Sequence, residues 1–408
     1  MRNEEIKKIK ENILNPLLWE YVYLIILSFF LLFYSLYTVQ YPANWPQPTF
    51  SYLRTALFVY VFLKYTFMNK ECLTMNEIAL IFILLCSFLT SYQNTGYIEL
   101  LDTVFLILGA KGLKYQSVLK TYLLVKVMFI ISVVLGSQLG ILENLVYNQH
   151  GRIRESFGFI YPTDFAAQVF FVIGAWAIFR KLRLTAVELI GMVLLAVFLK
   201  WKCDARTSMI CILCITGGAV LLKIAEHFEK RNFIYKKVQR ILKIGFLSSP
   251  YIFAGFMILA CRFYNSDNSI LAWINRVTSQ RLRLGKKTFD NYNINLFGQY
   301  IEMAGNGGTT KKPADYTFID CSYSNILMRF GLVVFVVVML LITFVMFKYY
   351  QSILVMGVFA VICLHSVMEH HLLEIHYNFM LLLPFCLFSE EVKSVECHIV
   401  KNWLKPTR

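Results

Sequence analysis

The chain has 408 residues, of which 58% are hydrophobic and 16% are charged, and its formal net charge is +15. This composition excludes an ordinary soluble domain, because apolar runs of roughly 18 residues or more, long enough to cross a bilayer, recur along most of the chain. The densest group of basic residues lies in a short connector, 223–243, between two apolar runs. Such placement is typical of cytoplasmic loops and argues against a nucleic-acid partner.

The apolar runs predict an all-α, polytopic integral membrane protein that forms one domain over residues 1–408. In chain order, about twelve transmembrane helices are expected at 21–39, 52–68, 78–93, 97–110, 119–142, 163–179, 187–201, 207–222, 244–261, 323–347, 352–368 and 376–389. Several of these runs are shorter than the roughly 20 residues of a typical span. The third and fourth are short enough to form a re-entrant pair, which would leave the orientation unchanged.

The positions of the basic residues predict which connectors face the cytoplasm. Lysines and arginines precede the first span and follow the fourth, sixth and eighth, so both termini are expected to be cytoplasmic and the protein to be a multi-pass protein of the cell membrane. The segments expected outside are 143–162, 201–206, 262–322 and 369–375. Of these, 262–322 is the large extracellular loop, which we expect to contain short amphipathic helices.

Residues 269–287 of this loop have the apolar period of one amphipathic helix. At about 100° per residue, one stripe contains Ile270, Ile274, Val277 and Leu284. Arg281 falls in the middle of that stripe, and Arg276 and Arg283 fall on the opposite side. Because an arginine on an inward face is costly unless it meets an anionic group, Arg281 is predicted to belong to a site. The alternative is a helix that ends near Gln280 and leaves Arg281 in solvent.

Arginines also lie on the other outer connectors. Arg152 and Arg154 precede the sixth span, Arg206 lies between the seventh and eighth, and Arg283 joins Arg281 in the large loop. Guanidinium groups bind phosphate oxygens in a bidentate manner, so converging arginines suit a diphosphate whose lipid tail stays in the bilayer. If the diphosphate is a leaving group, the same arginines stabilise its developing charge. The simpler alternative is contact with lipid head groups.

Several of these segments resemble Wzy-type polysaccharide polymerases, in particular those of Gram-positive capsule or exopolysaccharide clusters. The segments are NRVTSQRLRLG, NINLFGQ and DYTFIDCSYSNILMRFGLVVF in and after the large loop, ESFGFIYPTDFA after the fifth span, and VMEHHLLEIHYNF near the end. The family is grouped with the O-antigen ligases among the GT-C-like membrane glycosyltransferases. The resemblance covers most of the chain, although the motifs are loose.

The resemblance implies an inverting transfer of a glycan from a polyprenyl diphosphate to a sugar hydroxyl, at the external face and without a metal or another cofactor. Its partners would be lipid-linked oligosaccharide repeat units, the lipid bilayer, and the flippase and chain-length regulator of the same pathway. O-antigen ligases carry a histidine before the span that follows the large loop, and this chain has Asp320 there. Asp320 is therefore the expected general base, with a helix N-cap as the alternative.

Further residues near the outer ends of the spans complete the expected site. Asp320, Arg281 and Arg206 are the expected catalytic residues. The expected substrate-binding residues are Arg152, Arg154, Arg283, Tyr323 and Glu369. The segment EHHLLEIH follows the eleventh span, and we interpret Glu369 as lining the site and its other polar residues as membrane-interface residues. His370 and Glu374 are four residues apart, which leaves a metal site on a shared helix face as a lesser alternative.

Two other functions compete with polymerisation. One is an O-antigen-ligase-like transfer of a glycan to a different acceptor. The other is a flippase or exporter of lipid-linked oligosaccharide, which generally binds its cargo near the middle of the membrane, often between repeated halves. This chain shows no similarity between its halves, and Asp102 is its main charge within an apolar run. A non-catalytic membrane scaffold would not require arginines on three outer connectors.

Overall fold

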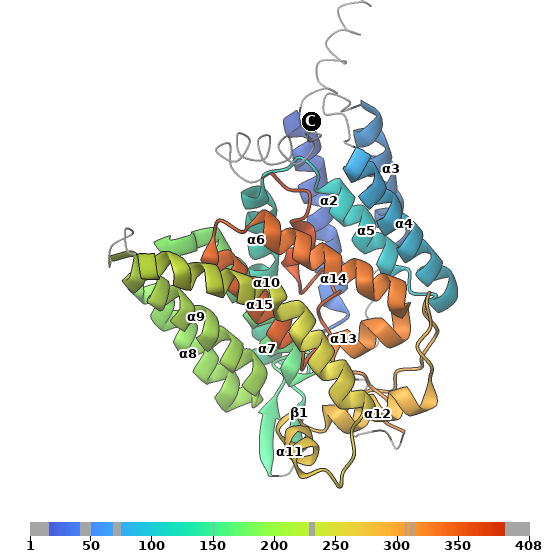
Figure 1. Cartoon of the computed structure of the whole chain (residues 1–408), viewed down its shortest axis with the longest axis vertical. Helices are drawn as coiled ribbons and strands as arrows, with labels where there is room; N and C mark the ends of the chain where they lie inside the picture. The colour runs from blue at the N-terminus through green and yellow to red at the C-terminus, as the bar shows by residue number, and fades with distance from the viewer. Residues whose placement is uncertain are drawn as a thin grey trace, which may run out of the picture.

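The structure, a computed structural model, describes residues 16–40, 50–67, 75–149, 151–227, 233–306, 308–310, 313 and 315–387. Most of these residues are helical, as predicted (Figure 1). Within the described ranges, seven helical segments are long and apolar enough to cross a membrane: Pro16–Leu36, Ile78–Thr95, Tyr115–Gln138, Pro162–Arg183, Arg206–Ala225, Lys236–Arg262 and Ser322–Lys348. A polytopic helical membrane protein is therefore supported, whereas the exact number of spans and their orientation stay predictions. Both termini lie outside the described residues.

The helices occur in the following order. They are α2 (Pro16–Leu36), α3 (Ser51–Phe67), α4 (Met75–Thr95), α5 (Glu99–Gly109), α6 (Tyr115–Gln138), α7 (Pro162–Arg180), α8 (Ala186–Cys203), α9 (Arg206–His227), α10 (Phe233–Arg262), α11 (Ser269–Val277), α12 (Arg281–Asn291), α13 (Ser322–Asn325), α14 (Gly331–Lys348) and α15 (Ile353–His365). Short 3-10 helices span Lys181–Arg183 and Phe379–Leu382, and a π-helical turn spans Ile326–Phe330.

Each of the first eleven predicted spans overlaps one of these helices, but the twelfth prediction is wrong. Residues 376–387 form turns and the short 3-10 helix instead of a span. The apolar side chains of residues 376–387 pack inside the protein, where Leu381, Leu382 and Leu383 are almost completely buried. An apolar run of this length is as compatible with a buried core segment as with a membrane helix.

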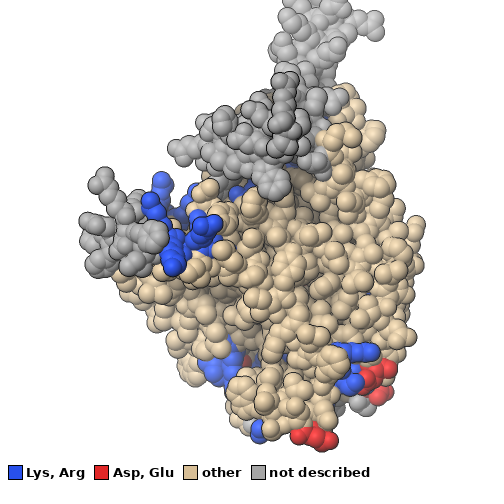
Figure 2. Space-filling model, viewed as in Figure 1, with Lys and Arg blue, Asp and Glu red and all other residues tan. Residues whose placement is uncertain are grey.

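The helices pack into one body around α15. Helix α15 contacts α7, α9 and α10, while α6 lies between α2 and α7, and α8 packs on α9. Large apolar side chains such as Ile25, Leu124 and Leu194 are exposed on the outer surface, as expected of helices that face lipid. In Figure 2, a broad uncharged surface separates the basic residues beside the start of α10 from charged residues at the end formed by β1, α11 and α12. This distribution supports membrane embedding.

A buried ion pair joins α2, α3 and α5. The Asp102 carboxylate accepts hydrogen bonds from Arg54 Nε at 2.6 Å and Nη2 at 2.7 Å, and from the Tyr34 hydroxyl at 2.5 Å. A buried carboxylate with these partners has its charge and its acceptor capacity satisfied. Asp102 therefore has a structural explanation in this protein and does not require a transported cargo.

The outer connectors depart from a purely helical fold in one place. Strand β1 (Val146–Gln149) pairs with β2 (Arg152–Glu155) in an antiparallel hairpin. Gly151, immediately before β2, has a φ of +74°, which glycine adopts without steric cost. The hairpin was not predicted. It holds Arg152 and Arg154 on one rigid element.

The single helix predicted for residues 269–287 is wrong, because the chain breaks between α11 and α12. Ser279 and Gln280 adopt left-handed conformations, with φ of +51° and +68°, and Gln280 precedes the first residue of α12. The break resets the helical phase, so Ile270 and Val277 of the predicted inward stripe are 69% and 60% exposed. The Arg281 side chain is nevertheless only 15% exposed, which also excludes the alternative that it lies in solvent.

The segment before α14 is fixed by close backbone contact with the large loop. Leu332 N and Val333 N, two of the N–H groups that a helix start leaves without partners, donate to Asn295 O and Leu296 O. A Cβ atom on Gly331, which has a φ of +93°, would lie 2.3 Å from Gly298 N. Glycine is therefore required at this crossing. The contact attaches residues 295–298 of the large loop to the start of α14.

Candidate functional site

A cavity of ≈ 1490 Å³ lies where the four predicted outer connectors meet. Arg154 of the β hairpin, Asp204 of the α8–α9 turn, Arg281 of α12 and Glu369 of the segment after α15 all line it. These residues are far apart in the sequence, and the prediction that they gather on one side of the protein is confirmed. Whether that side is extracellular stays a prediction.

Arginines line the cavity from several elements. They are Arg152, Arg154, Arg206, Arg276, Arg281, Arg283 and Arg329. The predicted residues Arg152, Arg154, Arg206, Arg281 and Arg283 are therefore brought together. Arg276 and Arg283 also line the cavity, although the single-helix prediction placed them on the side opposite Arg281.

Asp204 holds two of these arginines in place. It follows α8 in a left-handed conformation, with φ of +47°, and accepts a hydrogen bond from Arg152 Nη1 at 2.7 Å. Arg206 Nε lies 3.5 Å from the same carboxylate, and Lys200 also donates to it. Burial alone raises the pKa of Asp204, but the bonds from Lys200 and Arg152 outweigh it and hold the pKa below its usual value. Asp204 is thus ionised and positions the guanidinium groups.

Arg154 is held separately from this group. Its Nε donates to Cys203 O at 2.9 Å, and its guanidinium carbon lies 5.5 Å from the centre of the Tyr161 ring. Arg154 is also close enough to Glu369 to lower the pKa of that carboxyl. The hairpin therefore presents Arg152 to Asp204, and it presents Arg154 to Cys203 O and the Tyr161 ring, within electrostatic range of Glu369.

Arg281 lies between two carboxylates. Its Nε is 3.9 Å from Asp320 Oδ2 and its Nη2 is 3.6 Å from Glu369 Oε1, and each of the three side chains is at most 15% exposed. Arg281 Nε also donates to Met368 O at 3.0 Å. The anionic group that the sequence predicted for Arg281 is therefore supplied in part by the protein itself.

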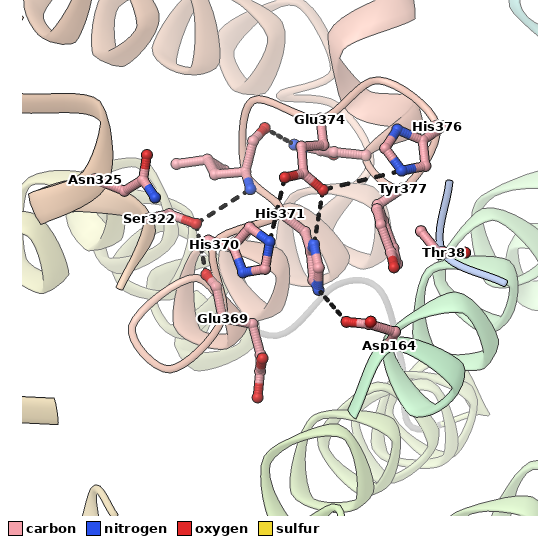
Figure 3. Close-up of polar contacts among 12 residues, drawn as sticks. Thr38, Asp164, Ser322, Asn325, Glu369, His370, His371, Glu374, His376 and Tyr377 are labelled. Atoms are coloured by element: carbon pink, nitrogen blue, oxygen red, sulfur yellow. Dashed lines mark hydrogen bonds and ion pairs between the residues drawn. The ribbon is translucent and has the colours of Figure 1, made fainter. Parts of the chain in front are cut away.

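The backbone around Glu369 is fixed by Ser322. The Ser322 hydroxyl donates to Glu369 O at 2.6 Å and accepts from Leu372 N at 3.1 Å, which ties the segment after α15 to the start of α13 (Figure 3). Burial raises the pKa of the Glu369 carboxyl to about 7, although the Arg281 guanidinium lowers it. A carboxylate with this pKa can accept a proton near neutral pH.

Of the two predicted residues at the start of α13, only Asp320 faces the cavity. Asp320 lines it beside Arg281. Tyr323 is completely buried, and its hydroxyl donates to Cys363 O at 2.8 Å, a contact that joins α13 to α15. The structure thus places Tyr323 in the helix packing, outside the residues that line the cavity.

Polar residues after α15 form a compact group in the cavity wall (Figure 3). The group contains His370, His371, Glu374 and His376, with Asp164 from the first turn of α7 beside them. The interpretation of these residues as membrane-interface residues is wrong, since His371 and His376 are 1% and 8% exposed. Burial lowers the pKa of His370 and of His371 to about 3, so both imidazoles are neutral.

Two cavity residues were missed by the sequence analysis, Arg329 and Asp164. Arg329 lies in the π-helical turn, where its Nη1 donates to Asn325 Oδ1 at 3.2 Å and its guanidinium carbon lies 4.2 Å from the centre of the Tyr97 ring. Its buried Nε has no hydrogen-bond partner among the described residues. Both residues lie within predicted apolar spans, but close to the span ends that meet the cavity.

No known protein family, curated protein or solved structure matches this chain. Its function must therefore be inferred from the cavity itself, which combines many guanidinium groups with buried carboxylates at one end of a helical membrane protein.

Proposed function

We propose that the protein is a membrane glycosyltransferase that polymerises lipid-linked oligosaccharide repeat units into capsular or exopolysaccharide at the outer face of the cell membrane. The observation that carries the proposal is the Arg281–Glu369 pair, which places a buried carboxylate and a guanidinium 3.6 Å apart in an arginine-lined cavity. Glycosyl transfer from a diphosphate needs both a proton acceptor and a binding site for the anionic leaving group.

In this proposal, Glu369 is the general base. It accepts the proton of the acceptor sugar hydroxyl while that oxygen bonds to the anomeric carbon of the donor. The bond from this carbon to the diphosphate oxygen breaks at the same time, and inversion results. The pKa of Glu369, about 7, supports this assignment, whereas the sequence favoured Asp320. Asp320, 3.9 Å from Arg281, orients that guanidinium.

The arginines supply the site for the leaving diphosphate. Arg329 supports this role most directly, because its buried Nε lacks a partner among the described residues and such a donor is costly unless it binds a ligand. Arg206, which is 60% exposed in its side chain, and Arg154 lie on other walls of the same cavity. Each well-placed donor can contribute about 3 kcal/mol to lowering the barrier.

The test is an analysis of lipid-linked and surface glycan after deletion of the gene from its host. We expect single repeat units to accumulate on the carrier lipid at the outer leaflet while long chains disappear. Long chains that remain attached to the lipid would instead indicate ligase-like transfer. Units retained on the cytoplasmic leaflet would indicate a flippase and refute the proposal. Purified protein should also extend a synthetic polyprenyl-diphosphate-linked unit.

A further inference from the structure

The group formed by His370, His371 and Glu374 has the geometry of a metal site. Their donor atoms all lie within 4.8 Å of one another. His371 Nδ1 is 2.8 Å from Glu374 Oε2, and His370 Nε2 is 3.4 Å from Glu374 Oε1 (Figure 3). Ligands of one tetrahedral ion at about 2 Å from the metal are separated by similar distances.

The backbone of this segment, rather than a helix, brings the three side chains together. Glu374 N donates to His371 O at 3.3 Å, and Asn378 N donates to Glu374 O at 2.8 Å, so residues 371–378 form consecutive turns. The Asn378 amide donates to Leu372 O at 2.7 Å and holds the turns closed. The three donors are thus set in place by the fold, as a preformed metal site requires.

A carboxylate lies behind one of the histidines. His371 Nε2, the nitrogen that points away from Glu374, is 3.9 Å from Asp164 Oδ1 and has no hydrogen bond within the described part of the chain. His371 itself is 1% exposed. Metal-binding histidines commonly present their second nitrogen to a carboxylate, which orients the ring and strengthens the ligand. The pair of Asp164 and His371 has this arrangement.

The donor atoms indicate which class of ion would bind. The group offers two imidazole nitrogens and a single carboxylate. Calcium and magnesium depend on several oxygen ligands. Two imidazoles and one carboxylate instead favour zinc and related transition metals, for which nitrogen coordination supplies much of the affinity.

We propose that His370, His371 and Glu374 bind one divalent transition-metal ion of the zinc class in the wall of the cavity. All three side chains line the cavity, so the remaining coordination positions are open to water or to an oxygen of an anionic ligand. The proposal is independent of glycosyl transfer, which we have described without a metal. A metal measurement can therefore fail while the transferase proposal stands, and the reverse also holds.

The experiment measures metal on the purified full-length protein in detergent. We expect about one bound ion per chain by elemental analysis, and after treatment with EDTA, titration with Co²⁺ should produce visible absorption that Zn²⁺ abolishes. His371→Gln and Glu374→Gln should weaken Co²⁺ binding by more than about tenfold. His376→Gln is the matched control and should retain binding, because His376 Nε2 is 4.0 Å from Glu374 Oε2 and His376 is not one of the three proposed ligands.

X-ray absorption of the wild-type protein loaded with Zn²⁺ tests the site without relying on variants that must fold. We expect a first shell of nitrogen and oxygen with an imidazole signature. The proposal is overturned if the wild-type protein binds neither Zn²⁺ nor Co²⁺, or if the first shell contains sulfur. It is also overturned if folded His371→Gln and Glu374→Gln proteins bind Co²⁺ as tightly as the wild type does.

Discussion

Replacing Glu369 with glutamine removes the proposed proton acceptor and changes little else in shape. Loss of general-base catalysis typically costs about 100-fold or more in rate, which corresponds to about 3 kcal/mol in the activation barrier. We therefore expect Glu369→Gln to reduce transfer by purified protein about 100-fold, with little change in donor binding. Transfer of a radiolabelled repeat unit onto a synthetic acceptor, at saturating donor, measures the rate.

The pH dependence of transfer distinguishes a base from a merely structural carboxylate. The pKa of Glu369 is about 7, so its basic form is the minor species below pH 7 and dominates above it. The rate of the wild-type protein should therefore rise about tenfold per pH unit below pH 7 and level off above it. Glu369→Gln should lack this rise. Protein treated with EDTA is used, so that no ion beside Glu369 changes its pKa.

The same shift predicts the effect of Glu369 on stability. Its pKa rises from 4.5 to about 7 on folding, because burial disfavours the charged carboxylate. The folded state therefore binds the proton more tightly than the unfolded state does. The resulting contribution to the free energy of unfolding is fully present below pH 4.5 and is lost as the pH rises to about 7. This amounts to about 3 kcal/mol. Glu369→Gln should accordingly melt at a higher temperature than the wild type at pH 8 and at a similar temperature at pH 4.5.

Two further variants complete the Glu369 experiment. Glu302→Gln, an exposed substitution in the large loop that does not line the cavity, is the control and should retain the wild-type rate and pH profile. Asp320→Asn tests the residue that the sequence favoured. If Asp320→Asn removes the rise with pH while Glu369→Gln keeps it, the assignment of Glu369 as the base is refuted.

Three other predictions follow from the cavity and its surroundings. Arg281→Ala should lower the rate of transfer about 100-fold. It should also move the pH profile to higher pH, because Arg281 lowers the pKa of Glu369. The control Lys287→Ala, on the exposed side of α12, should have neither effect. In intact cells, an impermeant maleimide should label Asp267→Cys and spare Lys237→Cys. The parent protein is the control for the reaction of native cysteines. Labelling of Lys237→Cys alone would show that the predicted orientation is reversed. Tyr323→Phe should destabilise the protein by about 1 kcal/mol in thermal unfolding and leave the transfer rate unchanged, since the Tyr323 hydroxyl bonds Cys363 O in the helix packing. A large loss of rate would show that Tyr323 takes part in the site.

The sequence alone was sufficient for the coarse organisation of the protein. Long apolar runs predict helices that face lipid, because backbone groups in a bilayer must be paired within each segment, and ten of the predicted spans overlap α2 to α10 and α15. The gathering of Arg154, Asp204, Arg281 and Glu369 was also predictable, since alternating connectors of a polytopic chain emerge on the same side. These predictions need only the length of each run and the sign of its flanking charges.

The tertiary structure decided which side chains face the cavity. Arg281 was predicted to be buried by helical phase, but the left-handed residues Ser279 and Gln280 break that helix, and Arg281 is buried because α12 packs it between Asp320 and Glu369. Helical periodicity cannot anticipate a break that depends on the conformation of two ordinary residues.

The choice of base and the histidine group likewise depend on packing. Glu369 differs from Asp320 through its burial and the hydrogen bonds that Ser322 makes to its segment, neither of which is written in the local sequence. His370, His371 and Glu374 converge through turns of a segment that the sequence predicted only as an outer connector. Composition records how apolar a segment is, but only the packing of distant elements determines whether that segment crosses the membrane or lines a cavity.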